Sequence, residues 1–344
     1  CLGCKRPGVQ VSPLRPVILR ICPETEVSGL FISCGVSGVC SMGLITAGQS
    51  LVATPVEALK TRLTATQRRL RARMDGVKRP TVGLALGSGA ARGLAHIGVL
   101  EVLFSSRIPV DVIVGCSMGA VIGGCYAAGM AASELLEIGM SIDRREVFRH
   151  IDLTVPNRGG LISGTKMDAL LEELTRGKTF EELRLPFACT AADINTGEEV
   201  VIEDGPIHKG IRASSSIPGV LQPVMHAGHA LVDGGILNPI PANYLAALGV
   251  DVSIAVDVMP VLKPSPEQLG KAPSIVSTLI NSFDIMGRLV AAPVACMATV
   301  VIRPQVGEVF GAEFWRGPEL ITEGFRAAEA AVPAIREALD SGRT

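Results

Sequence analysis

From Thr81 onward, the chain alternates short apolar runs with longer amphipathic segments. That alternation is typical of an α/β protein, in which helices cover a central sheet. The apolar runs predict strands at Thr81–Leu86, Asp111–Val114, Phe187–Ala192, Glu199–Ile202, Ala230–Val232, Val252–Val256 and Thr299–Ile302. The amphipathic segments predict helices at Leu94–Ser105, Met118–Ala128, Ala132–Ile142, Lys166–Leu174, Ala242–Leu248, Ile275–Met286 and Glu319–Ala338. Because internal repeats are absent from the sequence, we expect residues 78–344 to form one α/β domain.

Residues 1–77 have a different texture and are predicted to be an extension rather than a domain. Helical spacing is found only near Lys60–Arg73, in a basic segment. The most apolar part, Leu30–Leu44, lies in a charge-free stretch ahead of those basic residues, as in a membrane anchor with cytoplasmic positive charges. Serine and glycine dilute this run, so two alternatives to an anchor stay open. One is a signal peptide, disfavoured by the late start of the run, and the second is non-native sequence upstream of a true start at Met74.

Charge and cysteine content exclude several function classes. The formal net charge is -1 and the pI about 6.6, so the chain lacks the basic field that holds nucleic acid. Charged residues make up 19% and hydrophobic residues 48%, which favours a buried sheet or an apolar contact surface. The nine cysteines are odd in number and unevenly spread, which argues against a secreted disulfide framework. Cys1 and Cys4 lack a second pair at ligand spacing, so we expect reduced thiols, no metal and a cytoplasmic protein.

A glycine-rich loop, Gly87-Ser88-Gly89-Ala90-Ala91-Arg92-Gly93, follows the first predicted strand and precedes a helix. Backbone N–H groups at a helix N-terminus stabilise negative charge, so the loop suits either a phosphate or an oxyanion. Arg92 stands where a dinucleotide fingerprint needs its third glycine, and the lysine of a Walker loop is missing. Such turns are often purely structural, so this loop alone is weak evidence.

A second motif, Gly115-Cys116-Ser117-Met118-Gly119, also joins a predicted strand to a predicted helix. A nucleophile elbow requires this context, because flanking glycines let neighbouring backbones approach a serine held in a sharp, strained turn. The G-x-S-x-G spacing alone also occurs in ordinary turns. In this strand-turn-helix context it predicts that Ser117 is a nucleophile.

The base that activates Ser117 is the harder question, because a serine hydroxyl is a poor nucleophile without one. The chain has five histidines and none lies in its last third, so a triad would need a combination such as Asp193 with His226 or His229. The alternative is Asp233, which ends an apolar run and precedes Gly234 and Gly235. A carboxylate serves as a base when burial raises its pKa and a hydrogen bond fixes its geometry. Alone, the Asp-Gly-Gly string is also compatible with a β-turn.

Taken in order, the three motifs resemble those of the patatin-like phospholipases, specifically bacterial members related to the catalytic domain of neuropathy target esterase. The resemblance extends through Arg92-Gly93-Leu94-Ala95-His96-Ile97-Gly98-Val99-Leu100 and Ala213-Ser214-Ser215-Ser216-Ile217-Pro218, and covers roughly Lys78 to the C-terminus. It implies a three-layer α/β/α fold with a mainly parallel sheet. It also implies a Ser117–Asp233 dyad that cleaves acyl esters of lipids, without a cofactor, through an acyl-enzyme.

The resemblance also implies an oxyanion hole in the first loop, which we assign to Gly87, Ser88, Gly89 and Ala90. Where the family often reads G-G-G-x-R-G, this chain has Ser88 and Ala90. Both are small, and because an oxyanion hole uses backbone N–H groups, it should survive. Among the four, we favour the amides of Gly89 and Ala90 as donors. Arg92 has two interpretations, a brace for the loop or a contact for anionic head groups; Gly93, Gly115, Gly119, Gly234 and Gly235 are assigned to shaping the turns.

Several further residues are expected to be structural. We predict that His96 is a packed core residue, that Cys116 is a small buried hydrophobe, and that Asp193 shapes a turn. The segment from Ser214 to Pro223 is predicted to be a loop lining the acyl pocket, and residues 143–185 a flap over the site. The expected partner is a lipid or other acyl ester, with membrane-surface association and oligomeric state left open. The alternative function is a regulatory or adaptor protein that keeps the fold with little or no hydrolase activity.

Overall fold

A computed structural model describes residues 32–34, 40–42, 56–149, 151–152, 159–260, 272–307 and 309–341. The chain divides into two compact units, Cys1–Leu51 and Val52–Thr344. In the first unit, β1 (Ile32–Cys34) pairs antiparallel with β2 (Cys40–Met42). The membrane anchor predicted over Leu30–Leu44 otherwise lies outside the described residues.

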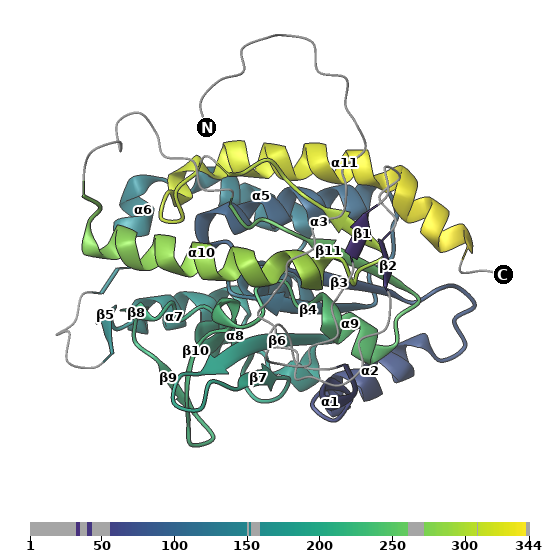
Figure 1. The fold of residues 1–344 in the computed structure, drawn as a ribbon, viewed down its shortest axis with the longest axis horizontal. Helices are drawn as coiled ribbons and strands as arrows, with labels where there is room; N and C mark the ends of the chain where they lie inside the picture. The colour runs from purple at the N-terminus through teal and green to yellow at the C-terminus, as the bar shows by residue number, and fades with distance from the viewer. Residues whose placement is uncertain are drawn as a thin grey trace, which may run out of the picture. The chain divides into compact units, whose positions relative to one another are not determined.

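The second unit is built on an eight-stranded sheet (Figure 1). The strands are β3 (Val82–Leu86), β4 (Val112–Cys116), β6 (Phe187–Asp193), β7 (Glu199–Ile202), β9 (Val224–His226), β10 (His229–Asp233), β11 (Val252–Val256) and β12 (Val300–Ile302). Their order is β12-β11-β3-β4-β6-β10-β9, with β7 also paired to β6. The strands from β12 to β6 are parallel, whereas β7, β9 and β10 pair antiparallel. The mainly parallel sheet predicted from the sequence is therefore confirmed.

Helices cover both faces of this sheet, because its strands are apolar on both sides. On one face, Leu84 and Leu86 share a core with α3 (Ala95–Ser105), α4 (Met118–Ala127), α5 (Ala132–Ser141) and α11 (Gly317–Ser341). On the other, Ala85 and Val114 share a core with α1 (Val56–Lys60), α2 (Thr64–Met74), α9 (Ala242–Leu248) and the end of α10 (Ile275–Ala295). The alternation along each strand thus produces the expected three layers.

The first helices, α1 and α2, belong to this unit rather than to a separate extension. Leu59, Leu63 and Leu70 are at most 5% exposed and pack in the same core as α9. The carboxylate of Glu203 accepts from two N–H groups at the N-terminus of α2, each at 2.8 Å. The compact unit therefore begins at Val52, ahead of the boundary expected between residues 77 and 78.

The elements near the candidate site differ most from the sequence-based expectation. Residues 143–185 contain α6 (Arg144–Arg149), β5 (Gly160–Ile162) and α7 (Thr165–Leu174). The predicted loop from Ser214 to Pro223 is the end of α8 (Ile207–Ser214), a turn and β8 (Gly219–Leu221), which pairs with β5. Helix α10 continues to Ala295, nine residues past the predicted end at Met286.

Candidate active site

Ser117 occupies the sharp turn between β4 and α4 and has the strained backbone that the sequence predicted. Its φ is 54° and its ψ is -122°, outside the regions that residues other than glycine usually adopt. A Cβ at Gly119 would lie 2.1 Å from the carbonyl oxygen of Leu86, and one at Gly115 would lie 2.6 Å from the Cα of Ala120. Both flanking positions therefore require glycine for the close backbone approach.

Asp233 ends β10 and accepts a hydrogen bond from Ser117. The Ser117 Oγ donates to its Oδ2 at 2.5 Å, while the N–H of Gly235 donates to its Oδ1 at 2.8 Å. The sheet register explains this meeting: Cys116 on β4 is level with Thr190 on β6, next to the residue that faces Asp233 across the sheet. The strand ends therefore place serine and carboxylate together.

The carboxyl group of Asp233 is fully buried, and burial raises its pKa to about 7. The hydrogen bonds from Ser117 and Gly235 act in the opposite direction, because they stabilise the ionised form. A pKa near neutrality suits a general base, which needs both an ionised fraction and proton affinity. The neighbouring Cys116 is also buried, as predicted.

The histidines lie elsewhere. His229 bonds the carboxylate of Asp193 through Nδ1, at 2.7 Å, and it stands four residues before Asp233 on β10. That separation is about 13 Å along a strand. His226 pairs with His229 across the β9–β10 ladder. No hydrogen bond in the described part of the chain joins Ser117 to a histidine.

His96 is a core residue, as predicted. Its Nε2 lies 2.8 Å from the carbonyl oxygen of Gly87 and its side chain is fully buried. Burial lowers its pKa to about 4, so the ring is neutral at physiological pH. His96 therefore holds the first residue of the glycine-rich loop in place through this hydrogen bond.

In the glycine-rich loop, two of the four assigned amides are already used. The N–H of Gly87 donates to Val256 O at 3.2 Å, and that of Ser88 donates to Pro239 O at 2.7 Å. These two amides are therefore wrong as oxyanion donors, because the neighbouring strand and loop hold them. Within the described residues, no backbone hydrogen bond uses the N–H of Gly89 or Ala90.

The loop lies directly against the elbow. A Cβ at Gly93 would be 2.4 Å from Cγ of Met118, the residue after Ser117. Met118 opens α4, and the first N–H groups of a helix have no partner inside it. Its amide is thus a further oxyanion donor candidate that the motif assignment missed, although the position after an elbow nucleophile was a usable signal.

Arg92 braces the loop from inside the protein. Its side chain is 1% exposed, its Nε donates to Val309 O at 2.6 Å, and its Nη2 lies 2.9 Å from Oδ2 of Asp284 on α10. Of the two interpretations, contact with a head group does not fit so enclosed a side chain. Asp284 was not anticipated, because its partner is 192 residues away in the sequence.

Arg212 on α8 organises the other side of the dyad. It is buried, and its guanidinium donates to Ser216 Oγ at 2.5 Å and to the carbonyl oxygen of Ser163 at 3.0 Å. Ser216 O in turn accepts the backbone N–H of Asp233 at 2.9 Å, and Ser214 Oγ accepts that of Ser117 at 3.0 Å. One short segment therefore fixes both members of the dyad.

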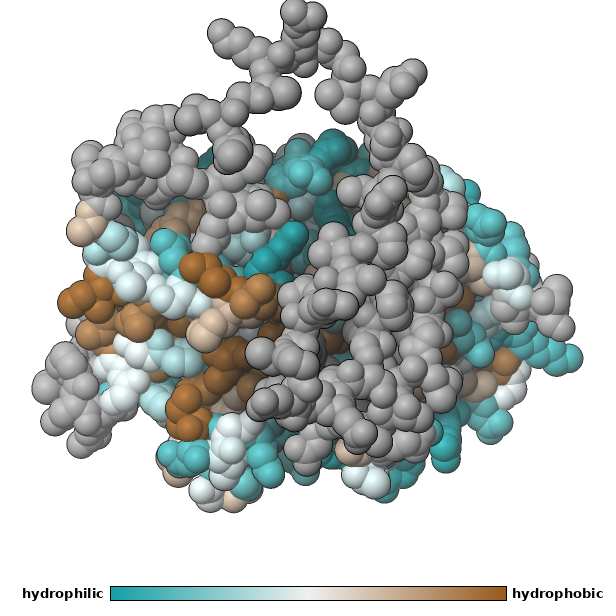
Figure 2. Space-filling model, in the orientation of Figure 1, coloured by the Kyte–Doolittle hydropathy of each residue, from teal (hydrophilic) through white to brown (hydrophobic). Residues whose placement is uncertain are grey.

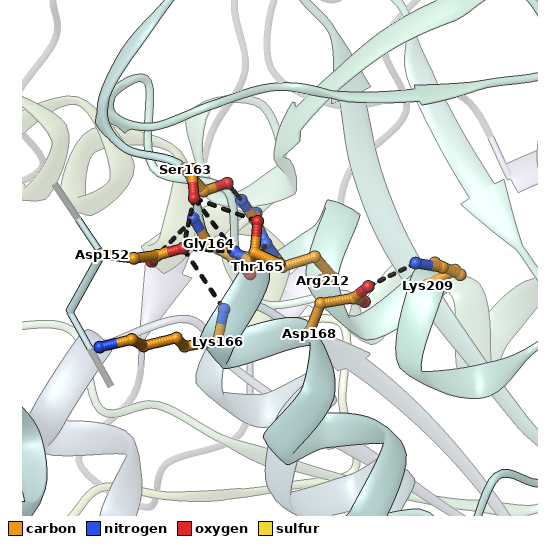
Figure 3. Close-up of polar contacts among 8 residues, drawn as sticks. All are labelled: Asp152, Ser163, Gly164, Thr165, Lys166, Asp168, Lys209 and Arg212. Carbon is orange, nitrogen blue, oxygen red and sulfur yellow. Dashed lines mark hydrogen bonds and ion pairs between the residues drawn. The ribbon is translucent and has the colours of Figure 1, made fainter. Parts of the chain in front are cut away.

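Arg212 also connects α8 to residues 143–185, the region predicted to be a flap. A Cβ at Gly164 would lie 2.1 Å from Nη2 of Arg212, so the close contact requires glycine. The Asp152 carboxylate accepts from the N–H groups of Gly164, Thr165 and Lys166, which stabilises the start of α7 (Figure 3). Arg212 was missed because two of its partners, Gly164 and Ser163, are 48 and 49 residues away in the sequence, although the serine run that follows it was noted.

Comparison with known proteins shows a family that this arrangement resembles. The sequence profile described as patatin-like phospholipase matches residues 84–246, a range that contains the elbow, the glycine-rich loop and Asp233. This part of the chain is similar to the patatin-like phospholipases. At the level of that family, the similarity is to lipid hydrolases.

In individual similar proteins, the region that matches this chain is part of a longer sequence. An uncharacterised NTE family protein of Mycobacterium tuberculosis is 38% identical over 186 residues, which are 54% of this chain and 51% of that protein. A protein named lysophospholipase NTE1 from Pyricularia oryzae is 27% identical over 290 residues, 75% of this chain and 19% of its own. The crystal structure of VipD from Legionella pneumophila superposes with a TM-score of 0.42 at 14% identity, covering 93% of this chain and 71% of that one. The chain thus spans about half the length of the mycobacterial relative.

Proposed function

We propose that the chain is a serine acyl-ester hydrolase that acts on lipids, as a phospholipase A or lysophospholipase does, through a dyad of Ser117 and Asp233. The observation that carries this proposal is the 2.5 Å hydrogen bond from a strained elbow serine to a buried carboxyl group. The raised pKa of that carboxyl group supports the role of base. The match to the patatin-like phospholipase model supports a lipid substrate.

In the first half of the reaction, Asp233 Oδ2 accepts the proton of Ser117 Oγ while that oxygen bonds to the ester carbonyl carbon. The carbonyl oxygen becomes an oxyanion, which the free N–H groups of Gly89 and Ala90 stabilise. Loss of one such donor typically raises a barrier by about 3 to 4 kcal/mol. When the tetrahedral intermediate collapses, the alcohol oxygen leaves with the proton held on Asp233, and the acyl group stays on Ser117.

In the second half, water gives a proton to Asp233 and its oxygen attacks the acyl carbon. The intermediate collapses again, Ser117 Oγ takes the proton back, and the fatty acid is released. The carboxyl group ends in its starting state. The cycle therefore uses only this chain's own side chains and amides.

The test of this function combines a lipid panel with intact-mass measurement of the acyl-enzyme. We expect phospholipid or lysophospholipid turnover, and a mass increase equal to the acyl group that maps to Ser117. Ser117→Ala abolishes both, whereas Ser141→Ala, whose hydroxyl donates to Ile138 O in its own helix, changes neither. A folded wild-type chain with no turnover on any ester or phospholipid would favour the regulatory or adaptor alternative. Loss of activity in His229→Gln would instead favour a histidine base.

A further inference from the structure

Helix α10 has two faces of similar polarity, which is unusual for a helix at a protein surface. Its inward stripe of Ile280, Phe283, Asp284, Gly287, Ala291 and Val294 is buried. The opposite stripe carries Ile275 and Leu289, which are 76% and 75% exposed, and Ile285 and Met286, which are about half exposed. Thr278 and Ser282 are also exposed on this stripe, but it carries no charged residue, whereas surface helices normally present charged residues there.

Figure 2 shows hydrophobic side chains gathered on this face of the molecule, toward the left of the view where Figure 1 draws α10. Among the described residues, α10 is also the one helix that is long and apolar enough to span a membrane. Only 28% of the residues in its most apolar 18-residue stretch are buried. Because its inner stripe packs on the domain, the helix is suited to lie on the surface of a membrane rather than to span it.

The charges on α10 favour a lipid surface over a protein partner. The helix has two charged residues, Asp284 and Arg288. Asp284 is buried against Arg92, so it contributes no negative charge to the outer face. Arg288 is exposed and donates one hydrogen bond, to Met259 O. Protein interfaces usually contain several hydrogen bonds between the partners. An apolar face with a single cation instead suits contact with acyl chains, with the cation near anionic head groups.

The inner stripe of α10 packs against residues next to the site. Phe283 on the inner stripe covers Gly235, where an added Cβ would lie 2.7 Å from its ring. The Arg92–Asp284 pair joins α10 to the glycine-rich loop. Ser117 itself is 3% exposed, so the protein beneath α10 encloses the dyad. The outer face of α10 therefore lies on the helix that covers the turn after Asp233 and the glycine-rich loop.

We propose that the outer face of α10, formed by Ile275, Ile285, Met286 and Leu289, docks on a lipid surface and presents the site to it. The inference rests on the proposed function for its biological purpose, but it makes a separate physical claim. Binding to vesicles requires this face, and turnover of a water-soluble ester does not.

The experiment uses the full chain with vesicles of phosphatidylcholine, with and without phosphatidylglycerol. The test variant is Ile285→Glu with Leu289→Glu, which adds two charges to the face without touching the dyad. The matched control is Phe104→Glu, because Phe104 is a large apolar side chain that is 66% exposed at the end of α3. Co-sedimentation measures binding, p-nitrophenyl butyrate measures soluble turnover, and circular dichroism checks folding.

We expect wild type and Phe104→Glu to bind vesicles, and the double variant to bind at least tenfold more weakly with soluble turnover within twofold of wild type. The proposal is overturned if wild type does not bind vesicles, or if both variants lose binding equally. A wild-type dimer that the double variant converts to monomer would also overturn it, because a second copy would then cover the face. If no chain hydrolyses any ester but vesicle binding follows the expected pattern, the proposed function fails and the docking surface stands.

Discussion

Ser117 Oγ and Asp233 Oδ2 lie 2.5 Å apart although 116 residues separate them in the chain. Two strand ends and one buried segment create this contact. The ladder from β4 through β6 to β10 brings the ends level, and the N–H groups of both residues are held by the serines that follow Arg212. The geometry of the pair is therefore a property of the whole sheet, and each of its physical consequences can be measured.

The pH dependence of activity should follow Asp233. Its pKa is raised to about 7 by burial, and only the ionised form accepts the serine proton. We expect kcat/KM on a soluble ester to rise about tenfold per pH unit below pH 7 and to level off above it. The measurement is a profile from pH 5 to 9, with circular dichroism at each pH. A flat profile from pH 5 to 7 with an intact fold would show that another group is the base.

The stability of the fold should depend on the same carboxyl group. Ionisation of Asp233, which activity requires, should lower the free energy of unfolding. Its folded-state pKa lies above the unfolded value, so ionisation disfavours the folded state. Wild type therefore loses stability as pH rises from about 4 to about 7, and the loss persists above pH 7. We expect Asp233→Asn to be inactive yet more stable than wild type at pH 8, by roughly 1 to 3 kcal/mol. Urea unfolding at pH 8 and pH 4 tests this, because the advantage should shrink at the lower pH. An Asn variant less stable than wild type at pH 8 would contradict it.

Removing the segment before Met74 should destabilise the domain. A chain that begins at Met74 lacks Leu59, Leu63 and Leu70, all buried in the core with α9. Burial of one leucine side chain contributes about 1.5 to 3 kcal/mol, so the loss is a large part of a typical domain's stability. We expect a melting temperature at least about 10 °C lower, or insoluble protein. The control is a chain that begins at Val52, which should have the same melting temperature as the full chain. Equal melting of all three would mean that α1 and α2 are dispensable.

Arg212 should act on turnover through Ser216, whose carbonyl oxygen accepts the N–H of Asp233. Lysine keeps the charge but cannot reproduce the guanidinium's several hydrogen bonds. For Arg212→Lys we expect kcat to fall about 10- to 100-fold with KM nearly unchanged, because a small displacement of the dyad affects the chemical step. Lys209→Gln is the matched control, since Lys209 forms an exposed ion pair with Asp168 in the same network. A change in KM alone would assign Arg212 to substrate binding instead.

The sequence revealed those parts of the site whose cause is local. The strand, glycine and helix around Ser117 all lie within a few residues of it, so the elbow was predictable. The amides of Gly87 and Ser88 were not, because their partners, Val256 and Pro239, come from distant parts of the chain. Arg212 and Asp284 were missed for the same reason, since a buried cation or acid is recognised only with its contacts. The core role of Leu59 likewise depends on packing that no local period shows.

The most direct test of the dyad is the rate of labelling by a fluorophosphonate probe. We expect wild type to be labelled at Ser117, Ser117→Ala to show no label, and Asp233→Asn to be labelled at least about 100-fold more slowly, as expected when a serine loses its base. Asp193→Asn, which changes the other carboxylate on the β6–β10 pair, should be labelled at the wild-type rate. Equal labelling of wild type and Asp233→Asn would contradict the account.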